Sequence, residues 1–295
     1  MKKKLAIVLC GTSNMTFAIA SAVINFQKNY KGSDYEFIVF TDGKFKEKDK
    51  ELINNIHKTI FIDYDFPLKD KLNNKTAGTK HFTYMVFAKF ECLKLLNEYE
   101  TVIYTDYDVY ITGNISELEN KSESGIKALI SEGAITNNLI NKIDEYNMKG
   151  DSMITGLIVL QDHLKNYNEI YDFCYDATLK YFDNLYFPEQ VAFSLMLQEF
   201  DIKPEKLDIN KYYLLPNNYP NFPDAKILHS YGFHKFWNGI KDDSLKLWNE
   251  NYNEWINMGG SRYKNTNKLF YKLMLKISWL IPKREWRDNF RLKFM

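Results

Sequence analysis

The chain has 295 residues, of which 45% are hydrophobic, 16% aromatic and 26% charged, a composition typical of a folded protein and not of a disordered one. Its formal net charge of +1 argues against a nucleic-acid-binding protein, and its length allows one large α/β domain with an appendage. The charge is unevenly placed. Residues 262–295 contain ten Lys or Arg and two acidic residues, so they carry +8 and the rest of the chain carries −7.

Cysteine usage and the apolar runs bear on where the protein works. Cys10, Cys92 and Cys174 are far apart and match no metal-binding spacing, which indicates buried thiols in a reducing compartment. The lysines at residues 2–4 precede an apolar run at 5–10 that is too short for a signal peptide, so we interpret it as a first core strand. The sequence has no apolar run of membrane-spanning length. We therefore expect a cytoplasmic protein.

Strands and helices are expected to alternate along most of the chain. The expected strands, rich in apolar and β-branched residues, are 5–10, 35–41, 59–62, 102–104, 109–112, 126–130, 153–160 and 225–230. The expected helices are 15–30, 46–56, 82–96, 162–182, 188–200 and 244–257. Residues 65–80 and 212–223 are expected to be loops, whereas 133–151 fits either a loop or helical excursions. The alternation predicts an α/β fold with a parallel, doubly wound sheet.

Two carboxylates, Asp106 and Asp108, directly follow the apolar run at residues 102–104. A buried strand would deliver both to one edge of the sheet, where ligands bind in α/β proteins. Because uncompensated carboxylates repel each other, a divalent cation is the simplest partner for them. A second pair, Asp63 and Asp65, also ends a strand, but a proline and a loop follow it, so we favour Asp106 and Asp108.

A second cluster lies at the expected last strand, where His229, Gly232, Lys235 and Trp237 have the spacing H-x2-G-x2-K-x-W. Imidazole combined with carboxylates suits Mn²⁺, which tolerates nitrogen better than Mg²⁺, the other candidate. Glycine permits close approach of the backbone, and lysine is a point charge suited to a phosphate. Together with the aspartate pair, this cluster predicts a site for a metal ion and a diphosphate.

These motifs resemble glycosyltransferase family 8, the retaining group that includes bacterial lipopolysaccharide galactosyl- and glucosyltransferases and glycogenin. The matching segments are YTDYD at 104–108, GNISEL at 113–118, Glu189-Gln190 where the family has Asp-Gln, and the H-x2-G-x2-K-x-W motif. The matches extend from about residue 5 to residue 240, which is most of the chain. The resemblance implies a GT-A type, Rossmann-like single domain with a central, mostly parallel sheet, which we place at residues 1–260.

The resemblance also implies which residues form the site. Asp106, Asp108 and His229 would bind Mn²⁺, which bridges the two phosphates of a UDP-sugar donor. The residues implied to contact the sugar nucleotide are Cys10, Gly11, Thr12, Asn14, Lys89, Asp106, Tyr107, Gly232 and Lys235. Gln190 would lie nearest the anomeric carbon, and Glu189 would hold hydroxyls of the donor sugar. The donor would be a UDP-hexose, with galactose or glucose transferred to a lipid-linked or other cell-envelope glycan.

Three positions depart from the family pattern. The acidic residues that usually follow the first strand and hold uridine are absent, since residues 11–14 are GTSN. Ile154 replaces the asparagine of Asn-Ala-Gly and leaves Thr155-Gly156, and Lys89 replaces an arginine, which keeps the charge and loses the bidentate fork. Two other classes therefore stay open: a nucleotidyl or phosphoryl transferase that uses the same aspartate pair, and a non-catalytic binder of nucleotide sugars or glycans.

The basic tail, defined as residues 261–295, has its own pattern. Apolar residues at helical spacing (Leu269, Phe270, Leu273, Met274, Ile277, Leu280 and Ile281) alternate with Lys268, Lys272 and Lys276. A basic amphipathic helix of this kind is typical of an anchor on anionic lipid, and the alternative is a helix docked on the domain. We expect the tail to hold the protein at the inner face of the cytoplasmic membrane.

Overall fold

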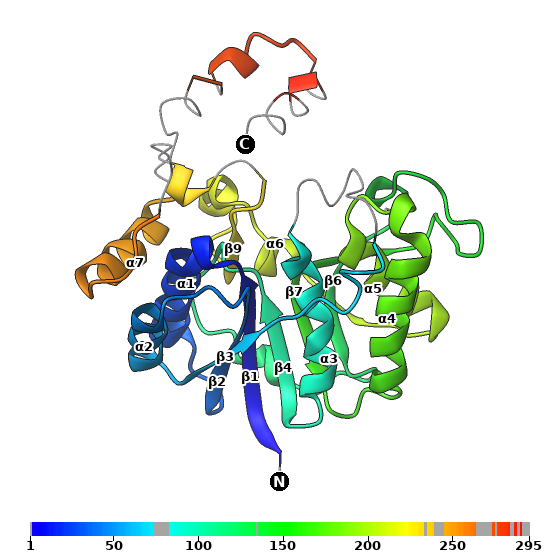
Figure 1. Ribbon diagram of the computed structural model, residues 1–295, viewed down its shortest axis with the longest axis horizontal. Coiled ribbons are helices and arrows are strands. Elements are labelled where there is room, and N and C mark those ends of the chain that lie inside the picture. The colour runs from blue at the N-terminus through cyan, green and yellow to red at the C-terminus, as the bar shows by residue number, and fades with distance from the viewer. Residues whose placement is uncertain are drawn as a thin grey trace.

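The computed structural model describes residues 2–72, 83–133, 135–232, 235–238 and 245–263, together with 273–274, 276–283, 286–287 and 290. Its described part is an α/β fold with a seven-stranded sheet in the order β3-β2-β1-β4-β7-β6-β8. Figure 1 shows this sheet in the middle of the fold. The strands are β1 (Lys3–Gly11), β2 (Tyr35–Thr41), β3 (Thr59–Asp63), β4 (Tyr99–Thr105), β6 (Ile126–Ser131), β7 (Ser152–Gln161) and β8 (Glu205–Leu207). Four of the six pairings are parallel, which confirms the predicted mostly parallel sheet.

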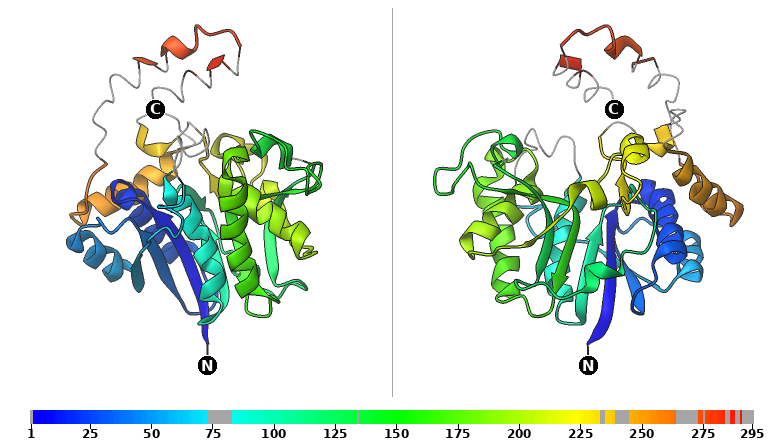
Figure 2. Two further views of the ribbon diagram at one scale, coloured as in Figure 1. Left: turned by 45° about the vertical axis from the view of Figure 1, so that its right-hand side comes forward. Right: turned by 180° about the vertical axis from the view of Figure 1, so that it is seen from behind.

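Helices cover both faces of this sheet (Figures 1 and 2). One face is covered by α1 (Thr16–Asn29) and α2 (Glu47–Ile56), with α7 (Lys246–Asn257) packed beside α1. The other face is covered by α3 (Glu91–Leu95), α4 (Tyr167–Tyr181) and α5 (Pro188–Glu199). Successive side chains of β1 alternate between these two cores, because side chains along a strand point to opposite faces. Burial on both faces explains why β1 is a continuous apolar run and not an alternating pattern.

The strand order reverses between β1 and β4. The chain builds β1, β2 and β3 outward in one direction and then returns to pair β4 with β1 on the other side. In open α/β sheets such a reversal leaves a crevice at the carboxyl ends of the two strands, where ligands bind. The carboxyl end of β4 is followed at once by Asp106, which places the predicted aspartate pair at this point.

Several elements differ from the sequence-based expectation. Strand β7 is antiparallel to both of its neighbours, so the sheet is not parallel throughout. The helix expected at 82–96 is a 3-10 helix over Tyr84–Phe90 continued by the short α3. The short elements β8 and α6 (Ile209–Tyr212) were not predicted, and β5 (Val109–Ile111) and β9 (Ile227–His229) form a separate two-stranded sheet. The segment at 133–151 is mostly irregular, with a 3-10 turn at Ile135–Asn138.

A buried acidic residue ties strand ends together far from the aspartate pair. Glu36, at the start of β2, is 3% exposed and accepts hydrogen bonds from Lys3 and from the Tyr99 hydroxyl, and Lys58 pairs with its other oxygen. These partners come from the beginnings of β1 and β4 and from the residue before β3. Burial alone would raise the pKa of Glu36, but the two lysines and the tyrosine lower it to about 2.

The predicted basic tail is largely outside the described residues, which exclude 264–272, 275, 284–285, 288–289 and 291–295. Within the described part of the chain, no helix is long and apolar enough to cross a membrane. Ser261 and Tyr263 contact the preceding domain: Ser261 accepts from the Trp255 indole, and the Tyr263 ring packs on Phe17. The domain division at residue 260 and the membrane association stay predictions.

Candidate active site

The aspartate pair emerges from β4 into the turn that leads to β5. The backbone N–H of Asp106 donates to the carbonyl of Gly156 on β7, at 3.1 Å. Asp108 is 6% exposed, and its backbone carbonyl accepts from Ser230 at 3.0 Å. Both carboxylates are therefore fixed through backbone contacts with segments that are distant in sequence.

The short β5–β9 sheet brings His229 to the aspartates. Val109 on β5 pairs directly with His229 on β9, across 120 positions of sequence. The Nε2 atom of His229 lies 3.0 Å from Oδ1 of Asp108 and 3.6 Å from Oδ2 of Asp106. Ligand atoms of all three residues lie within 4.8 Å of one another, and no other group of three or more His, Cys, Asp or Glu among the described residues comes this close.

The donor set of this triad fits a divalent metal ion. Two carboxylate oxygens and one imidazole nitrogen are ligands for Mn²⁺ or another first-row metal, and hard carboxylates alone also accept Mg²⁺. One glycine makes room beside it: a Cβ at Gly156 would lie 2.8 Å from Cε1 of His229 and 2.6 Å from the ring of Tyr213. Gly156, the last residue of the family's Asn-Ala-Gly, is therefore required by the close approach of β7 to the imidazole. Gly232 has φ +75, a backbone conformation that favours glycine.

Lys235 lies against one of these carboxylates, that of Asp108. Its ammonium donates to Oδ2 of Asp108 and, at 2.6 Å, to the backbone carbonyl of Ser230. Burial alone would raise the pKa of Asp108, but Lys235 and His229 outweigh it and hold that pKa well below its usual range. Asp108 is thus kept ionised, as a metal ligand must be.

Lys89 links the metal triad to Glu189. Lys89 is 5% exposed, and its Nζ lies 3.4 Å from Oδ1 of Asp106 and 3.2 Å from Oε1 of Glu189. Burial opposes its charge, but the carboxylates of Asp106 and Glu189 prevail and raise the pKa of Lys89. A third partner, Thr155 on β7, was not predicted to act in the site; its hydroxyl lies 3.2 Å from Nζ of Lys89 and 3.1 Å from Oε1 of Glu189.

Glu189 and Gln190 lie in the first turn of α5, behind Pro188. Glu189 is 7% exposed and takes part in the contacts with Lys89 and Thr155. Gln190 is half-buried, and its backbone carbonyl accepts from Ser194 at 2.6 Å. The structure thus places Gln190 beside Glu189 on the helix, and no side-chain hydrogen bond of Gln190 is recorded with any described residue.

The residues predicted to hold the nucleoside lie at the end of β1. A Cβ at Gly11 would lie 3.3 Å from the ring of Tyr107, so Tyr107 and Gly11 are in contact, next to the aspartates. Thr12 hydrogen-bonds to Asn14 through their side chains. Cys10 is buried with its Sγ 3.3 Å from the Tyr104 hydroxyl, and burial raises the pKa of its thiol to about 12, so it carries no thiolate.

An acidic residue that sequence reasoning missed also reaches this region. Asp42, directly after β2, accepts from the backbone N–H and the hydroxyl of Ser13, at 3.0 and 3.1 Å. Since β1 and β2 are parallel neighbours, their carboxyl ends meet, and this brings a carboxylate to the strand end that lacks the family's acids. The sequence signal that could have identified Asp42 is its place in an Asp-Gly turn directly after the predicted strand at 35–41.

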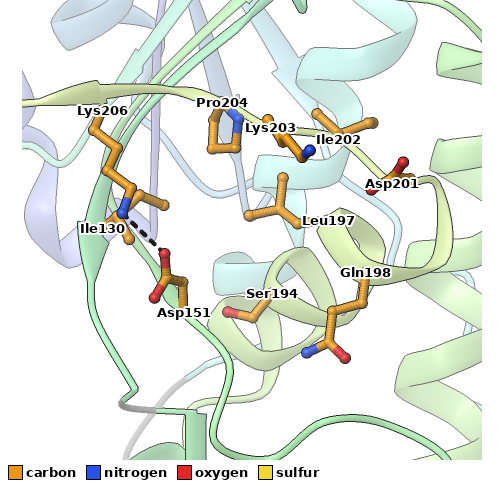
Figure 3. A pocket seen from close by; sticks show the side chains of 10 residues that line it. All are labelled: Ile130, Asp151, Ser194, Leu197, Gln198, Asp201, Ile202, Lys203, Pro204 and Lys206. Carbon is orange, nitrogen blue, oxygen red and sulfur yellow. Dashed lines mark ion pairs between the residues drawn. The ribbon is translucent and has the colours of Figure 1, made fainter.

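The rejected pair, Asp63 and Asp65, forms local contacts. Asp63 accepts from the Thr41 hydroxyl at 2.6 Å, and Asp65 pairs with Lys69 at 2.5 Å. A cavity of about 430 Å³, shown in Figure 3, lies between β6, β8 and α5, with an ion pair between Lys206 and Asp151 at 3.0 Å. None of the predicted site residues lines it.

Comparisons with known proteins give the family and the fold. The family model described as glycosyl transferase family 8 matches residues 6–241. No curated protein sequence matches the chain. Among solved structures, the galactosyltransferase LgtC in complex with donor and acceptor sugar analogues has a TM-score of 0.65 at 14% identity, over 86% of this chain and 99% of LgtC.

Two further solved structures share the fold. The apo structure of the bifunctional glycosyltransferase WbbM has a TM-score of 0.64 at 14% identity, over 88% of this chain, which spans about half (52%) of WbbM. The glycosyltransferase GlyE of Streptococcus pneumoniae TIGR4 has a TM-score of 0.58 at 15% identity, over 90% of this chain and 67% of GlyE. The α/β architecture is therefore that of GT-A enzymes. With the family model covering most of its length, the chain belongs to glycosyl transferase family 8.

Proposed function

We propose that the protein is a metal-dependent, retaining hexosyltransferase that moves galactose or glucose from a UDP-sugar to a cell-envelope glycan. The observation that carries this proposal is the convergence of Asp106, Asp108 and His229 at the point where the strand order reverses. A metal triad at a nucleotide crevice, with ammonium groups beside it, suits a donor that leaves as a nucleoside diphosphate.

The side chains around the triad have separable tasks in this proposal. A bound Mn²⁺ would act as a Lewis acid that stabilises the negative charge developing on the leaving diphosphate. Lys235 and the backbone at Gly232 would hold the diphosphate oxygens, and the Gly11–Asn14 segment with Tyr107 would hold the nucleoside. Gln190, in the first turn of α5, would face the anomeric carbon. Its task there would be to stabilise positive charge rather than to act as a nucleophile.

The proposed acceptor rests on the solved structures that share this fold. LgtC is a galactosyltransferase whose structure holds donor and acceptor sugar analogues, and WbbM is a bifunctional glycosyltransferase. By analogy we propose a lipid-linked or other envelope glycan, such as lipopolysaccharide, lipooligosaccharide, capsule or glycoprotein. The basic tail would keep the enzyme on the anionic inner face of the cytoplasmic membrane, where such acceptors are built.

The first prediction tests the reaction class. With Mn²⁺, a panel of UDP-hexoses and oligosaccharide acceptors, the full chain should release UDP, and Asp108→Asn should lower the rate at least about 100-fold, because several kcal/mol of charge stabilisation depend on the metal. Asp65→Asn is the matched control, since Asp65 is an exposed strand-end aspartate paired with Lys69; its rate should be unchanged.

The products separate the alternatives. Release of pyrophosphate or of a nucleoside monophosphate would identify nucleotidyl or phosphoryl transfer instead. Tight binding of UDP-sugars with no release of UDP, with or without acceptors, would identify a binding protein and contradict the proposed transferase.

A further inference from the structure

The buried contacts between Lys89, Thr155 and Glu189 determine which oxygen of the Glu189 carboxylate is hydrogen-bonded within the protein. Lysine can only donate hydrogen bonds and an ionised carboxylate can only accept them. The Thr155 hydroxyl between them must therefore accept from Lys89 and donate to Oε1 of Glu189, at 3.2 and 3.1 Å. Oε1 also accepts directly from Lys89 at 3.2 Å, so this oxygen has two protein donors.

The other oxygen of the same carboxylate is different. Oε2 of Glu189 is buried and has no hydrogen-bond partner among the described residues. A buried carboxylate oxygen without a donor is costly, and such groups in native proteins usually have a partner that the structure does not contain. Oε2 is therefore the one acceptor on this side chain that remains for a ligand that carries a hydroxyl.

Lys89 is held by three side chains of the site. An ammonium has three N–H groups, and Nζ has three oxygen neighbours, on Thr155, Glu189 and Asp106, at 3.2, 3.2 and 3.4 Å. Its side chain is buried. These contacts give Lys89 a role between two carboxylates.

The backbone explains why Thr155 reaches this place. The pairing of β6 with β7 shifts register between Ala128 and Leu129, which pair with Ile158 and Ile154 respectively. Residues 155–157 of β7 therefore have no partner on β6, an irregularity of the kind that re-aims side chains beside active sites. Ile154, which stands where the family has asparagine, lies just before it, and the polar side chain at this point is Thr155.

We propose that Thr155 is a positioning residue which, with Lys89, fixes Glu189 so that only Oε2 is offered to a hydroxyl of the donor sugar. This inference rests on the proposed function, because it takes the ligand to be the hexose of a UDP-sugar. Thr155 does not contact the sugar; it acts through Glu189. The hydroxyl group of Thr155 is thus a determinant of sugar binding and not of nucleotide binding.

The test compares affinities for UDP and for UDP-hexose, measured by calorimetry with Mn²⁺ on the full chain. Thr155→Val, which keeps the shape and removes the hydroxyl, should weaken UDP-hexose binding about 5- to 10-fold, the effect of losing one typical hydrogen bond, and change UDP binding less than about 2-fold. Thr155→Ser should restore UDP-hexose affinity. Thr178→Val is the matched control, since Thr178 is fully buried and its hydroxyl bonds only within α4; it should lose stability without losing sugar affinity.

Each outcome decides the proposal. Equal weakening of UDP and UDP-hexose in Thr155→Val, no weakening of either, or failure of Thr155→Ser to restore affinity would overturn the role of Thr155 and leave the proposed function intact. If the unaltered protein binds UDP but none of the UDP-hexoses, the proposed donor class fails, and this inference fails with it. A Thr155→Val protein that does not fold is replaced by Thr155→Ala, for which the same split between UDP and UDP-hexose is expected.

Discussion

At the scale of single residues, charge balance is the main feature of the site. Three carboxylates, on Asp106, Asp108 and Glu189, lie among two ammonium groups, on Lys89 and Lys235. Among these five side chains there is an excess of one negative charge. A divalent cation reverses that sign and makes the site attractive to a diphosphate, so metal and nucleotide are expected to favour each other's binding.

Glu36 gives a residue-scale prediction for acid stability. Its pKa is lowered to about 2 in the folded chain from a usual value of 4.5. Because the folded pKa is the lower one, the stabilisation is fully present above pH 4.5 and is lost as the pH falls toward 2. Glu36→Gln should lower the free energy of unfolding at pH 7 by about 1–3 kcal/mol, and the difference from the unaltered chain should shrink below pH 4.5.

Urea denaturation at a series of pH values measures this difference. Glu123→Gln is the control, since Glu123 is exposed and has no ion pair among the described residues; its curve should follow that of the unaltered chain. A Glu36→Gln deficit that stays constant from pH 7 to pH 2 would show that Glu36 acts through packing and not through its charge.

At the scale of elements, β7 matters because it approaches the imidazole so closely. Gly156→Ala would place a Cβ 2.6 Å from the Tyr213 ring and 2.8 Å from His229. One ring must move, which should cost about 1–3 kcal/mol of stability and weaken Mn²⁺ binding because His229 leaves the aspartates. Thermal unfolding and titration of Mn²⁺ followed by electron paramagnetic resonance measure the two effects.

The control for this variant is Gly113→Ala, where an added Cβ meets no atom within 4 Å. It should leave both stability and Mn²⁺ affinity nearly unchanged. Loss of stability in Gly156→Ala with full Mn²⁺ affinity would mean that only Tyr213 moves and that His229 keeps its place.

The elements also show how far sequence reasoning reaches. The strand before Asp106 and the helix after Pro188 are predictable, because apolar runs and a proline in the first turn are local signals. The antiparallel direction of β7 and its irregular pairing with β6 were not predictable, since both depend on which strands become neighbours in the sheet. Thr155 was missed for the same reason: a buried threonine in an apolar strand has no local mark of a role.

The site was predictable to the extent that its members lie in motifs. The spacing around His229 and the aspartate pair indicated the metal triad, and the structure brings these three residues together. Asp42 was missed because its approach to Ser13 follows from the parallel pairing of β1 with β2 and not from any spacing in the chain. Contacts between strand ends are set by sheet topology, which short sequence patterns do not specify.

At the scale of the whole molecule, the uneven charge gives a prediction for the basic tail. A chain that ends after Tyr263 keeps the contacts of Ser261 and Tyr263 with the domain. It lacks most of the positive charge of the basic tail. It should no longer sediment with anionic vesicles, because juxtamembrane basic residues each contribute about 1 kcal/mol of attraction to such surfaces.

Vesicles of neutral lipid are the control for the intact chain, which should bind them far less. Replacement of Lys268, Lys272 and Lys276 by glutamine should reduce binding to anionic vesicles partway. Equal sedimentation of the intact and shortened chains would contradict the proposed membrane role and favour a tail docked on the domain.

The β5–β9 pairing has a consequence for partial chains. The seven strands of the central sheet are complete at Leu207, but the third proposed metal ligand, His229, arrives only with β9. A fragment that stops between these points contains every strand of the sheet and both aspartates, yet it lacks the histidine. Proteolytic cleavage or premature termination there would leave a product that resembles the intact chain in sheet content and lacks one of the three proposed ligands. If the proposed site binds a metal ion, metal affinity would therefore distinguish the intact chain from such a fragment.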